Sequence, residues 1–188
     1  MSRKIIVGAT CASGMPVLVQ CLRLIREAGD SAELVYTPYA EQTLVTETDY
    51  TIGDLSRLVD NVYRPEEIGA GPASGTYPTD GMLIVPCSMK TVAGICSGYS
   101  DNLLLRAADV TVKEGRTLVL AARESPLSAI HLRNLLELSR IPGVRIIPPV
   151  MTFYHRPETL DEMTYHMAAK LVEPFGVEAK EYRRWTGI

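Results

Sequence analysis

Cysteine, histidine and long apolar runs are scarce in this sequence. It contains four cysteines and three histidines, with no Cys-x-x-Cys pair and no histidine at zinc-ligand spacing from a cysteine. This scarcity argues against a metal site and favours a reduced, intracellular protein. No apolar run approaches the length of a membrane span, and the run after Met1-Ser2-Arg3-Lys4 is too short for a signal peptide. We therefore expect a cytoplasmic protein with no metal and no membrane partner.

An excess of charge of either sign is also missing. The formal net charge is −3, so no strong field attracts nucleic acid, and we expect no nucleic-acid partner. The 188 residues fit one domain over 1–188, in which folding buries roughly 70% of the surface of the unfolded chain. Residues 174–188, after the last predicted helix, are expected to form a C-terminal tail.

Apolar runs alternate with segments of helical periodicity along the chain. The predicted strands cover residues 4–9, 33–37, 82–85, 117–122 and 144–147. The predicted helices cover residues 14–28, 39–47, 89–97, 102–112, 127–139 and 160–173, with a short helix near 52–59 and a Gly/Pro/Ser-rich loop at 69–79. This alternation predicts an α/β fold, a doubly wound parallel sheet of three layers with helices on both faces.

The turn after the first predicted strand consists of small residues, from Gly8 to Gly14. Ligands bind such sheets outside the carboxyl ends of the strands, and a small-residue turn that opens a helix suits an anion. The turn is neither a Gly-x-Gly-x-x-Gly fingerprint nor a P-loop. The second strand ends in Tyr36-Thr37, without an acid to hold a ribose diol. A mononucleotide is therefore favoured over a dinucleotide, and a tight turn without a ligand is the alternative.

Polar residues follow three other predicted strands. Ser88 and Thr91 offer hydroxyl groups at a second helix start, although Ser88 is equally interpreted as a helix N-cap. The pair Arg123-Glu124 and the segment 154–156 follow two further strands. Lysine, arginine, tyrosine and hydroxyl groups at strand ends are typical of a phosphate-binding site.

Nucleophilic or metal-dependent catalysis finds no support in the histidines. His131 and His166 lie within predicted helices, where a structural or exposed role is expected. No Ser-His-Asp set and no cluster of metal ligands emerges from the spacing. We expect a metal-independent site.

Seven segments, in this order, resemble the flavin prenyltransferase family of UbiX/Pad1-type flavoproteins, and the similarity runs over almost the whole chain. They are GATCASG at 8–14, TETD at 46–49, PCSMKT at 86–91, RAADVTVKEGR at 106–116, ARESPLS at 122–128, PPVMTFYHRPETLD at 148–161 and RRWTG at 183–187. The resemblance implies a flavodoxin-like (Rossmann-like) fold. It also implies a homo-oligomer built from trimers, a dodecamer, that binds FMN between subunits.

The resemblance further implies the reaction. Members transfer a dimethylallyl group from dimethylallyl monophosphate to N5 and C6 of reduced FMN. The product, prenylated FMN, serves a UbiD-type decarboxylase, and no metal is needed. The resemblance therefore implies that this chain is an enzyme.

Site residues follow from the family pattern position by position. Ser13 matches a residue near flavin N5, and Glu47 an acid that assists proton movement. The positions that match the prenyl-phosphate pocket are Lys113, Arg123, Glu124, Tyr154 and Lys170, with Trp185 as a tail aromatic beside it. The positions that match the cofactor site are Gly8, Ala12, Ser13, Thr37, Ser88, Met89, Lys90, Thr91 and Arg106.

These residue types suit the implied chemistry. A prenyl monophosphate departs only where cations and donors stabilise the charge that develops on phosphate. The resulting carbocation needs aromatic faces, which the flavin and Trp185 offer. Ring closure at C6 needs a base, which is either Glu47 or the released phosphate. When the other strand ends are considered together, we expect the turn to present Ser13 to the reactive edge of the flavin ring. Thr37 and the segment 88–91 are then expected to hold the phosphate and ribityl side of FMN.

One departure from the family pattern lies in the turn itself. Members often carry Thr-Gly-Ala-Ser-Gly where this chain has Cys11 in place of the first glycine, and glycine permits dihedral angles that cysteine avoids. Met15-Pro16, just after the turn, is also unusual. We expect this departure to affect the choice of prenyl donor rather than flavin binding.

Two other functions compete with prenyl transfer. The first is a non-catalytic flavin-binding subunit, which has no need of a phosphate-departure pocket. The second is an FMN-dependent decarboxylase of the peptidyl-cysteine type, which relies on an early histidine and an asparagine-rich stretch. Here the equivalent stretch is residues 86–91, and no histidine precedes His131.

Overall fold

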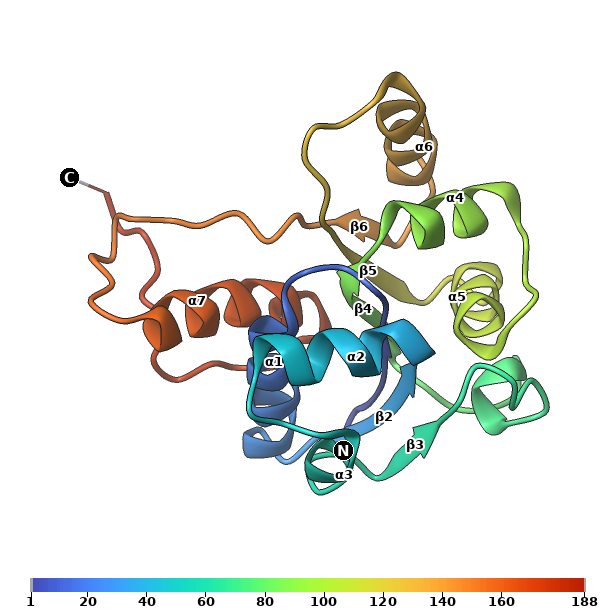
Figure 1. Cartoon of the computed structure of the whole chain (residues 1–188), viewed down its shortest axis with the longest axis horizontal. Helices are drawn as coiled ribbons and strands as arrows, with labels where there is room; N and C mark the ends of the chain where they lie inside the picture. Colours follow the sequence, from blue (N-terminus) through green and yellow to red (C-terminus); the bar gives the residue numbers. More distant parts are fainter. Residues whose placement is uncertain (1, 188) are drawn as a thin grey trace.

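A six-stranded, fully parallel sheet lies at the centre of the computed structural model, which describes residues 2–187 (Figure 1). Its order is β3-β2-β1-β4-β5-β6. The strands are β1 (Lys4–Ala9), β2 (Ser31–Tyr36), β3 (Asn61–Tyr63), β4 (Gly81–Cys87), β5 (Thr117–Ala122) and β6 (Val144–Ile146). The helices are α1 (Met15–Glu27), α2 (Pro38–Glu47), α3 (Ile52–Leu55), α4 (Met89–Ser97), α5 (Leu103–Lys113), α6 (Ala129–Ser139) and α7 (Leu160–Val172), with 3-10 turns η1 (Gly71–Ala73) and η2 (Glu173–Phe175).

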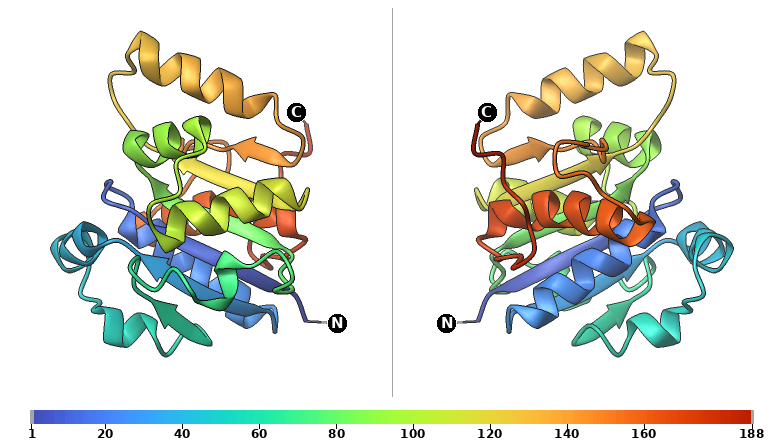
Figure 2. Two further views of the ribbon diagram at one scale, coloured as in Figure 1. Left: turned by 90° about the vertical axis from the view of Figure 1, so that its right-hand side faces the viewer. Right: turned by 90° about the vertical axis from the view of Figure 1, so that its left-hand side faces the viewer.

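Helices cover both faces of the sheet, which confirms the predicted three layers (Figure 2). Alternate residues of a strand point to opposite faces, so Val7 packs under α1 and α7 whereas Ile6 packs towards α4 and α5. Strands buried on both faces need continuous apolar runs, and these are what made them visible in the sequence. Within residues 2–187, no helix is long and apolar enough to cross a membrane.

Several elements depart from their predicted boundaries, such as β2, β4 and α3, and two departures have a clear physical reason. β3 was not predicted, because an edge strand of three residues carries no apolar run that would distinguish it from a loop. The predicted helix at 127–139 starts two residues later, as α6, because Ser128 caps it. The Ser128 hydroxyl accepts from the His131 amide, and His131 Nδ1 accepts from the Ser128 amide.

The segment expected as a tail is packed against the molecule at its start. Phe175 and Val177 are buried in the core beneath α1 and α7. Farther on, the backbone carbonyl of Arg183 lies 3.1 Å from Nε2 of His166 on α7. Residues 174–187 therefore continue the α1/α7 layer, and Ile188 lies outside the described residues.

A buried carboxylate ties the irregular segment before β4 to the sheet. Glu33 of β2 is 1% exposed and accepts hydrogen bonds from Tyr77 Oη (2.5 Å) and Asn61 Nδ2 (3.2 Å). Lys4 Nζ lies 3.4 Å from the same carboxylate and 4.6 Å from the centre of the Tyr77 ring. A buried charge is tolerated only when it is paired and hydrogen-bonded, so these contacts position residues 69–79.

Replacement of Glu33 tests this network. Glu33→Gln should lower the free energy of unfolding by about 2 kcal/mol, because Lys4 and Tyr77 lose their anionic partner. Urea unfolding followed by circular dichroism measures the change. Glu27→Gln, at an exposed position of α1, is the matched control and should change stability little. Equal stability of the two variants would contradict the role assigned to Glu33.

Candidate active site

The strand order reverses direction beside β1, because the chain passes from β1 to β2 on one side and later crosses to β4 on the other. Doubly wound sheets bind ligands at such a switch point, outside the carboxyl ends of the strands. The turn 10–14 and the segment 86–91 follow β1 and β4 there, and Thr37 follows β2. The topology therefore gathers three of the predicted segments at one edge.

A buried threonine joins the first two segments. Thr10 is 1% exposed, its hydroxyl donates to the carbonyl of Pro86 (2.9 Å), and the same oxygen accepts from the amide of Ser88 (2.8 Å). The amide of Arg123, after β5, donates to the carbonyl of Cys87 (3.0 Å). The loops after β1, β4 and β5 thus form one hydrogen-bonded rim.

Glu47 closes this rim from the end of α2. Its Oε2 accepts hydrogen bonds from the amides of Gly14 and Met15, both at 2.9 Å, and the Ser13 hydroxyl bonds to the same carboxylate. These amides are the unpaired donors at the amino terminus of α1, where the helix dipole favours a negative charge. Glu47 therefore occupies the place at which the turn 8–14 was first expected to bind an anion.

The surroundings of Glu47 keep it ionised. Burial acts to raise the pKa of this carboxyl, but the hydrogen bonds from Ser13, Gly14 and Met15 lower it, and so does the positive charge of Arg123. The net result is a pKa below the usual glutamate value. Ser13, Glu47 and Arg123, predicted from three separate segments, are thus in one electrostatic cluster.

Cys11 does not strain the turn. In the described chain the only non-glycine residue with positive φ is Arg156, whereas Gly14 has φ 133° and needs to be glycine. Cys11 is exposed, with its sulfur 3.7 Å from the hydroxyl of Thr43 on α2. Cysteine in place of the family's glycine therefore leaves the backbone of the turn in an ordinary conformation.

The segment after β4 shows Ser88 as a helix N-cap, and its part in ligand binding stays a prediction. Its hydroxyl caps α4 by accepting from the amide of Thr91 (3.4 Å), and it lies 3.1 Å from the Thr91 hydroxyl. Met89 points into the core and is 7% exposed, so only its backbone faces the edge of the sheet. Lys90 is exposed and lines a groove between α4 and α6.

Thr37 carries a buried hydroxyl without a partner among the described residues. Thr37 precedes α2 as its N-cap, but its side chain makes no capping hydrogen bond. Its amide donates to the carbonyl of Ala9 (3.0 Å), which fixes it beside the turn 10–14. Because buried hydroxyl groups are almost always hydrogen-bonded, this one points to a polar ligand atom.

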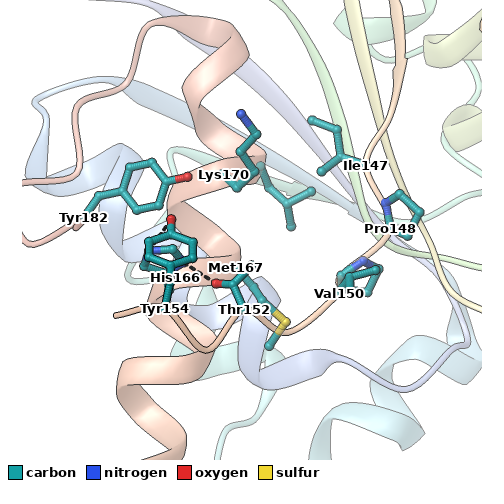
Figure 3. Close-up of a pocket in the computed structure, with 11 residues that line it drawn as sticks. Ile147, Pro148, Val150, Thr152, Tyr154, His166, Met167, Lys170 and Tyr182 are labelled. Atoms are coloured by element: carbon teal, nitrogen blue, oxygen red, sulfur yellow. Dashed lines mark hydrogen bonds between the residues drawn. The ribbon is translucent and has the colours of Figure 1, made fainter. Parts of the chain in front are cut away.

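A second group of predicted residues surrounds a cavity of about 180 Å³ between the segment 147–154 and α7 (Figure 3). Tyr154 and Lys170 line it, and Trp185 packs edge-on against Tyr154 with ring centres 5.7 Å apart. Lys170 Nζ donates to Glu173 (2.7 Å), which raises the pKa of the lysine and keeps it positively charged.

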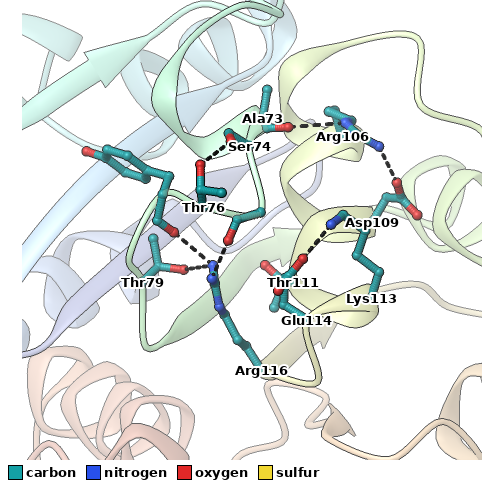
Figure 4. A network of polar contacts seen from close by, with 12 residues as sticks. Ala73, Ser74, Thr76, Thr79, Arg106, Asp109, Thr111, Lys113, Glu114 and Arg116 are labelled. Carbon is teal, nitrogen blue, oxygen red and sulfur yellow. Dashed lines mark hydrogen bonds and ion pairs between the residues drawn. The ribbon is translucent and has the colours of Figure 1, made fainter.

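Two other predicted residues lie apart from both groups, on α5 (Figure 4). Lys113 ends α5 and pairs with Glu114, near the start of β5. Arg123 follows the other end of β5. The six residues of this strand therefore separate Lys113 from Arg123 by about 20 Å. Arg106 bonds to the carbonyl of Ala73 (3.3 Å) and to Asp109 (2.6 Å) on the outer side of α5. One copy of the chain does not bring Lys113 and Arg106 to Ser13.

Three predicted positions have limited contacts. Gly8 lies inside β1, and a Cβ there would touch Met82 (3.1 Å) and Ile84 (3.3 Å). Glycine at this position therefore lets β1 pack closely against β4. Ala12 is half-buried in the turn, where its amide donates to Thr10 (2.9 Å). Glu124 is exposed, and its carboxylate bonds to the amide of Ser125 (3.0 Å).

Sequence reasoning missed Thr10 and His166. Thr10 stands directly after β1, so the strand-end rule applied to it as it did to Ser13. His166 was expected to be structural or exposed; it is buried, and what the sequence did not indicate is its place at the cavity beside Tyr154. The available signal was its position four residues before Lys170, which places both on one face of α7. Within residues 2–187, no three His, Cys, Asp or Glu side chains are arranged to hold a metal ion.

The whole chain is similar to proteins of one family. The flavoprotein family model matches residues 1–170. A probable UbiX-like flavin prenyltransferase of Escherichia coli O157:H7 is 47% identical over 186 residues, which cover 98% of this chain and 94% of the relative. This chain belongs to the UbiX-like flavin prenyltransferase family.

Two solved structures of the same family confirm the flavodoxin-like fold. A dodecameric, FMN-dependent UbiX-like decarboxylase from Escherichia coli O157:H7 has a TM-score of 0.95 at 47% identity, over 98% of this chain and 100% of that chain. AnUbiX (PadA1), solved in complex with FMN and dimethylallyl pyrophosphate, has a TM-score of 0.97 at 39% identity, over 100% of both chains.

The ionised state of Glu47 leads to a prediction about pH. Because its pKa in the folded state is lowered, the carboxylate stabilises the fold above the unfolded pKa, and this contribution is lost as the pH falls through the folded pKa. Glu47→Gln should therefore be less stable than wild type near pH 7, and the difference should shrink near pH 3. Urea unfolding at both values measures it.

The matched control for this prediction is Glu41→Gln, at an exposed position of the same helix. It should change stability little at either pH. A constant difference between Glu47→Gln and wild type across this range would show that the carboxylate is not held ionised by its neighbours.

Proposed function

We propose that this chain is a flavin prenyltransferase that joins the dimethylallyl group of dimethylallyl monophosphate to N5 and C6 of reduced FMN. N5 bonds to the prenyl C1 carbon and loses its proton as the C–O bond breaks and inorganic phosphate leaves. The prenyl double bond then takes up a proton at C2, and its C3 carbon bonds to C6, which loses its own proton. The observation that carries the proposal is the cluster at the switch point. There Ser13 bonds to the Glu47 carboxylate, which also feels the charge of Arg123, and the neighbouring strand β2 ends at Thr37, whose buried hydroxyl has no partner among the described residues.

The residues at this edge fit FMN. The Thr37 hydroxyl lacks a partner, and Ser88 and Thr91 offer further hydroxyls at the start of α4. These groups suit the phosphate and ribityl oxygens, with the amino termini of α2 and α4 beside them. Ser13 is exposed at the rim and is suited to the ring. When bound, reduced FMN supplies the two nucleophilic atoms, N5 and C6.

Arg123, Tyr154 and Lys170 are suited to the phosphate of the prenyl donor. Lys170 is kept charged by Glu173, and the Arg123 side chain is exposed after β5, where it is attracted to Glu47. Donors that are already oriented stabilise charge on a leaving phosphate without reorganisation. Trp185, edge-on to Tyr154, adds an aromatic side chain near a developing carbocation.

The environment of Glu47 favours one of the two possible bases. A carboxylate that accepts three hydrogen bonds and has a lowered pKa is a weak proton acceptor. Its part is then to orient Ser13, and the released phosphate is the better acceptor for the proton from C6. This proposal assigns Glu47 a positioning role.

Completion of the site requires a second copy of the chain. Lys113 and Arg106 match the family pattern, but they lie on α5, away from Ser13 in the same copy. We propose that a neighbouring copy supplies them in a homo-oligomer built from trimers. The Escherichia coli relative is dodecameric, and this chain is expected to form the same assembly.

The donor, the recipient of the product and the location are further proposals. AnUbiX was solved with dimethylallyl pyrophosphate, so both monophosphate and pyrophosphate need to be tested as donors. A UbiD-type decarboxylase is the expected recipient of prenylated FMN, because the family resemblance pairs the two. The cytoplasmic location inferred from the sequence stays a prediction.

Product analysis tests the proposed reaction. The protein is incubated without oxygen with reduced FMN and either dimethylallyl monophosphate or dimethylallyl pyrophosphate, and the released flavin is analysed by mass spectrometry. We expect a flavin that has gained one dimethylallyl group, with the monophosphate as the better donor. Unchanged flavin with both donors would exclude prenyl transfer and leave a flavin-binding subunit or a decarboxylase.

Mixed oligomers test whether the site is shared between copies. Lys113→Ala and Glu47→Gln should each abolish most activity, with FMN retained by Lys113→Ala. Co-expression of the two variants should restore about a quarter of wild-type activity, because a random mixture places both intact residues at a quarter of the sites. Rates of prenylated flavin formation measure this.

The control mixture combines Glu47→Gln with Arg123→Ala, whose positions belong to one cluster in one copy. This pair should not restore activity. A Lys113→Ala mixture as inactive as the control would contradict a site shared between copies.

A further inference from the structure

His166 contacts three polar partners from two other parts of the chain, although it is only 5% exposed. Its Nδ1 lies 3.1 Å from the hydroxyl of Thr152, and its Nε2 lies 3.1 Å from the carbonyl oxygen of Arg183. The same Nε2 lies 3.3 Å from the hydroxyl of Tyr154 (Figure 3). The ring therefore connects α7, the segment before it and the C-terminal segment.

These partners determine which nitrogen carries the proton. A carbonyl oxygen only accepts hydrogen bonds, so the Nε2 that faces Arg183 must be a donor. The Thr152 hydroxyl can donate to Nδ1, which completes a neutral ring. The N–H at Nε2 then points to the oxygen of Tyr154 as well, and the phenolic hydrogen of Tyr154 stays free.

We infer that His166 is a positioning residue for Tyr154 in the proposed prenyl transfer. By donating from Nε2 to the phenolic oxygen, it directs the Tyr154 O–H to the cavity that Tyr154 and Lys170 line. There the O–H is a donor for the phosphate of the prenyl donor. This inference rests on the proposed function for its ligand, but the direction of the hydrogen bond follows from the contacts alone.

His155 fixes the plane of the His166 ring. The two imidazoles are stacked, with centres 3.9 Å apart and planes 7° apart, and Tyr154 meets both of them edge-on. In the described chain neither ring nitrogen of His155 has a hydrogen-bond partner. Burial lowers the pKa of His155, and so do His166 and Arg183. The His155 ring that stacks on His166 is therefore uncharged near neutral pH.

The C-terminal segment is part of the same device. Arg183 supplies the carbonyl that sets the His166 tautomer, Tyr182 packs on the His166 ring with centres 4.5 Å apart, and Trp185 packs on Tyr154. The His166 imidazole therefore links the packing of residues 182–185 to the direction of the Tyr154 hydroxyl.

Paired substitutions at His166 test the positioning role. His166→Phe keeps an aromatic ring but removes both nitrogens, whereas the amide nitrogen of His166→Gln can take the place of Nε2. We expect His166→Phe to lower kcat about tenfold with little change in KM for the prenyl donor or in FMN affinity, which is less than the loss of a donor itself. His166→Gln should recover most of kcat, and equal kcat in the two variants would overturn the role.

Two features keep this test separate from that of the proposed function. Wild-type protein is assayed first, so absence of prenylated flavin there counts against the proposed function and not against His166. His131→Gln, on α6, is the matched control and should leave kcat unchanged.

A direct measurement needs no activity. Nitrogen-15 NMR of the histidine side chains in the full-length wild-type protein reports which nitrogen is protonated, and with three histidines the signals are assigned by His131→Gln and His155→Gln. We expect the His166 proton on Nε2. A neutral His166 ring with its proton on Nδ1 alone would overturn the inference, whether or not any variant folds.

Discussion

The Glu47 carboxylate sits on the unpaired amides at the start of α1, and the place of the turn 10–14 and of Ser13 at the rim depends on this contact. It joins the end of α2 to the start of α1 and accepts the Ser13 hydroxyl. A small-residue turn before a helix usually leaves these amides free for an external anion. Here the chain supplies its own anion, so in the proposed function the turn aims Ser13 and the phosphate lies at the neighbouring strand ends.

Much of this arrangement was predictable, for physical reasons that apply residue by residue. Buried parallel strands need continuous apolar runs, so β1, β4 and β5 were visible, whereas the three-residue edge strand β3 was not. The strand-end rule placed Ser13 and Arg123 at one edge, and in the structure both lower the pKa of Glu47.

Other features could not be obtained from sequence. Which nitrogen of His166 carries a proton depends on three contacts that come together only in the fold. The conformation at Cys11 also depends on the fold, because a departure from a glycine pattern matters only where φ is positive. Lys113 matches the family pattern as closely as Arg123, but its distance from the rim appears only when β5 is seen between them.

The site divides its tasks between two differently built groups. The rim at the switch point is polar and fixed by short hydrogen bonds between loops, which suits the orientation of a ring and its phosphate. The cavity beside α7 is lined by aliphatic side chains together with Tyr154, Tyr182, His166 and Lys170, which suits a prenyl phosphate. In the proposed site Lys113 and Arg106 come from a neighbouring copy, so assembly and activity are expected to depend on each other.

A crystal structure of the protein with FMN and dimethylallyl monophosphate tests the central claim most directly. The account predicts that Glu47 keeps its hydrogen bonds to the amides of Gly14 and Met15, with Ser13 at the flavin ring. It also predicts the FMN phosphate near Thr37 and the start of α4. An FMN phosphate bound to the amides of Gly14 and Met15, with Glu47 displaced, would contradict it.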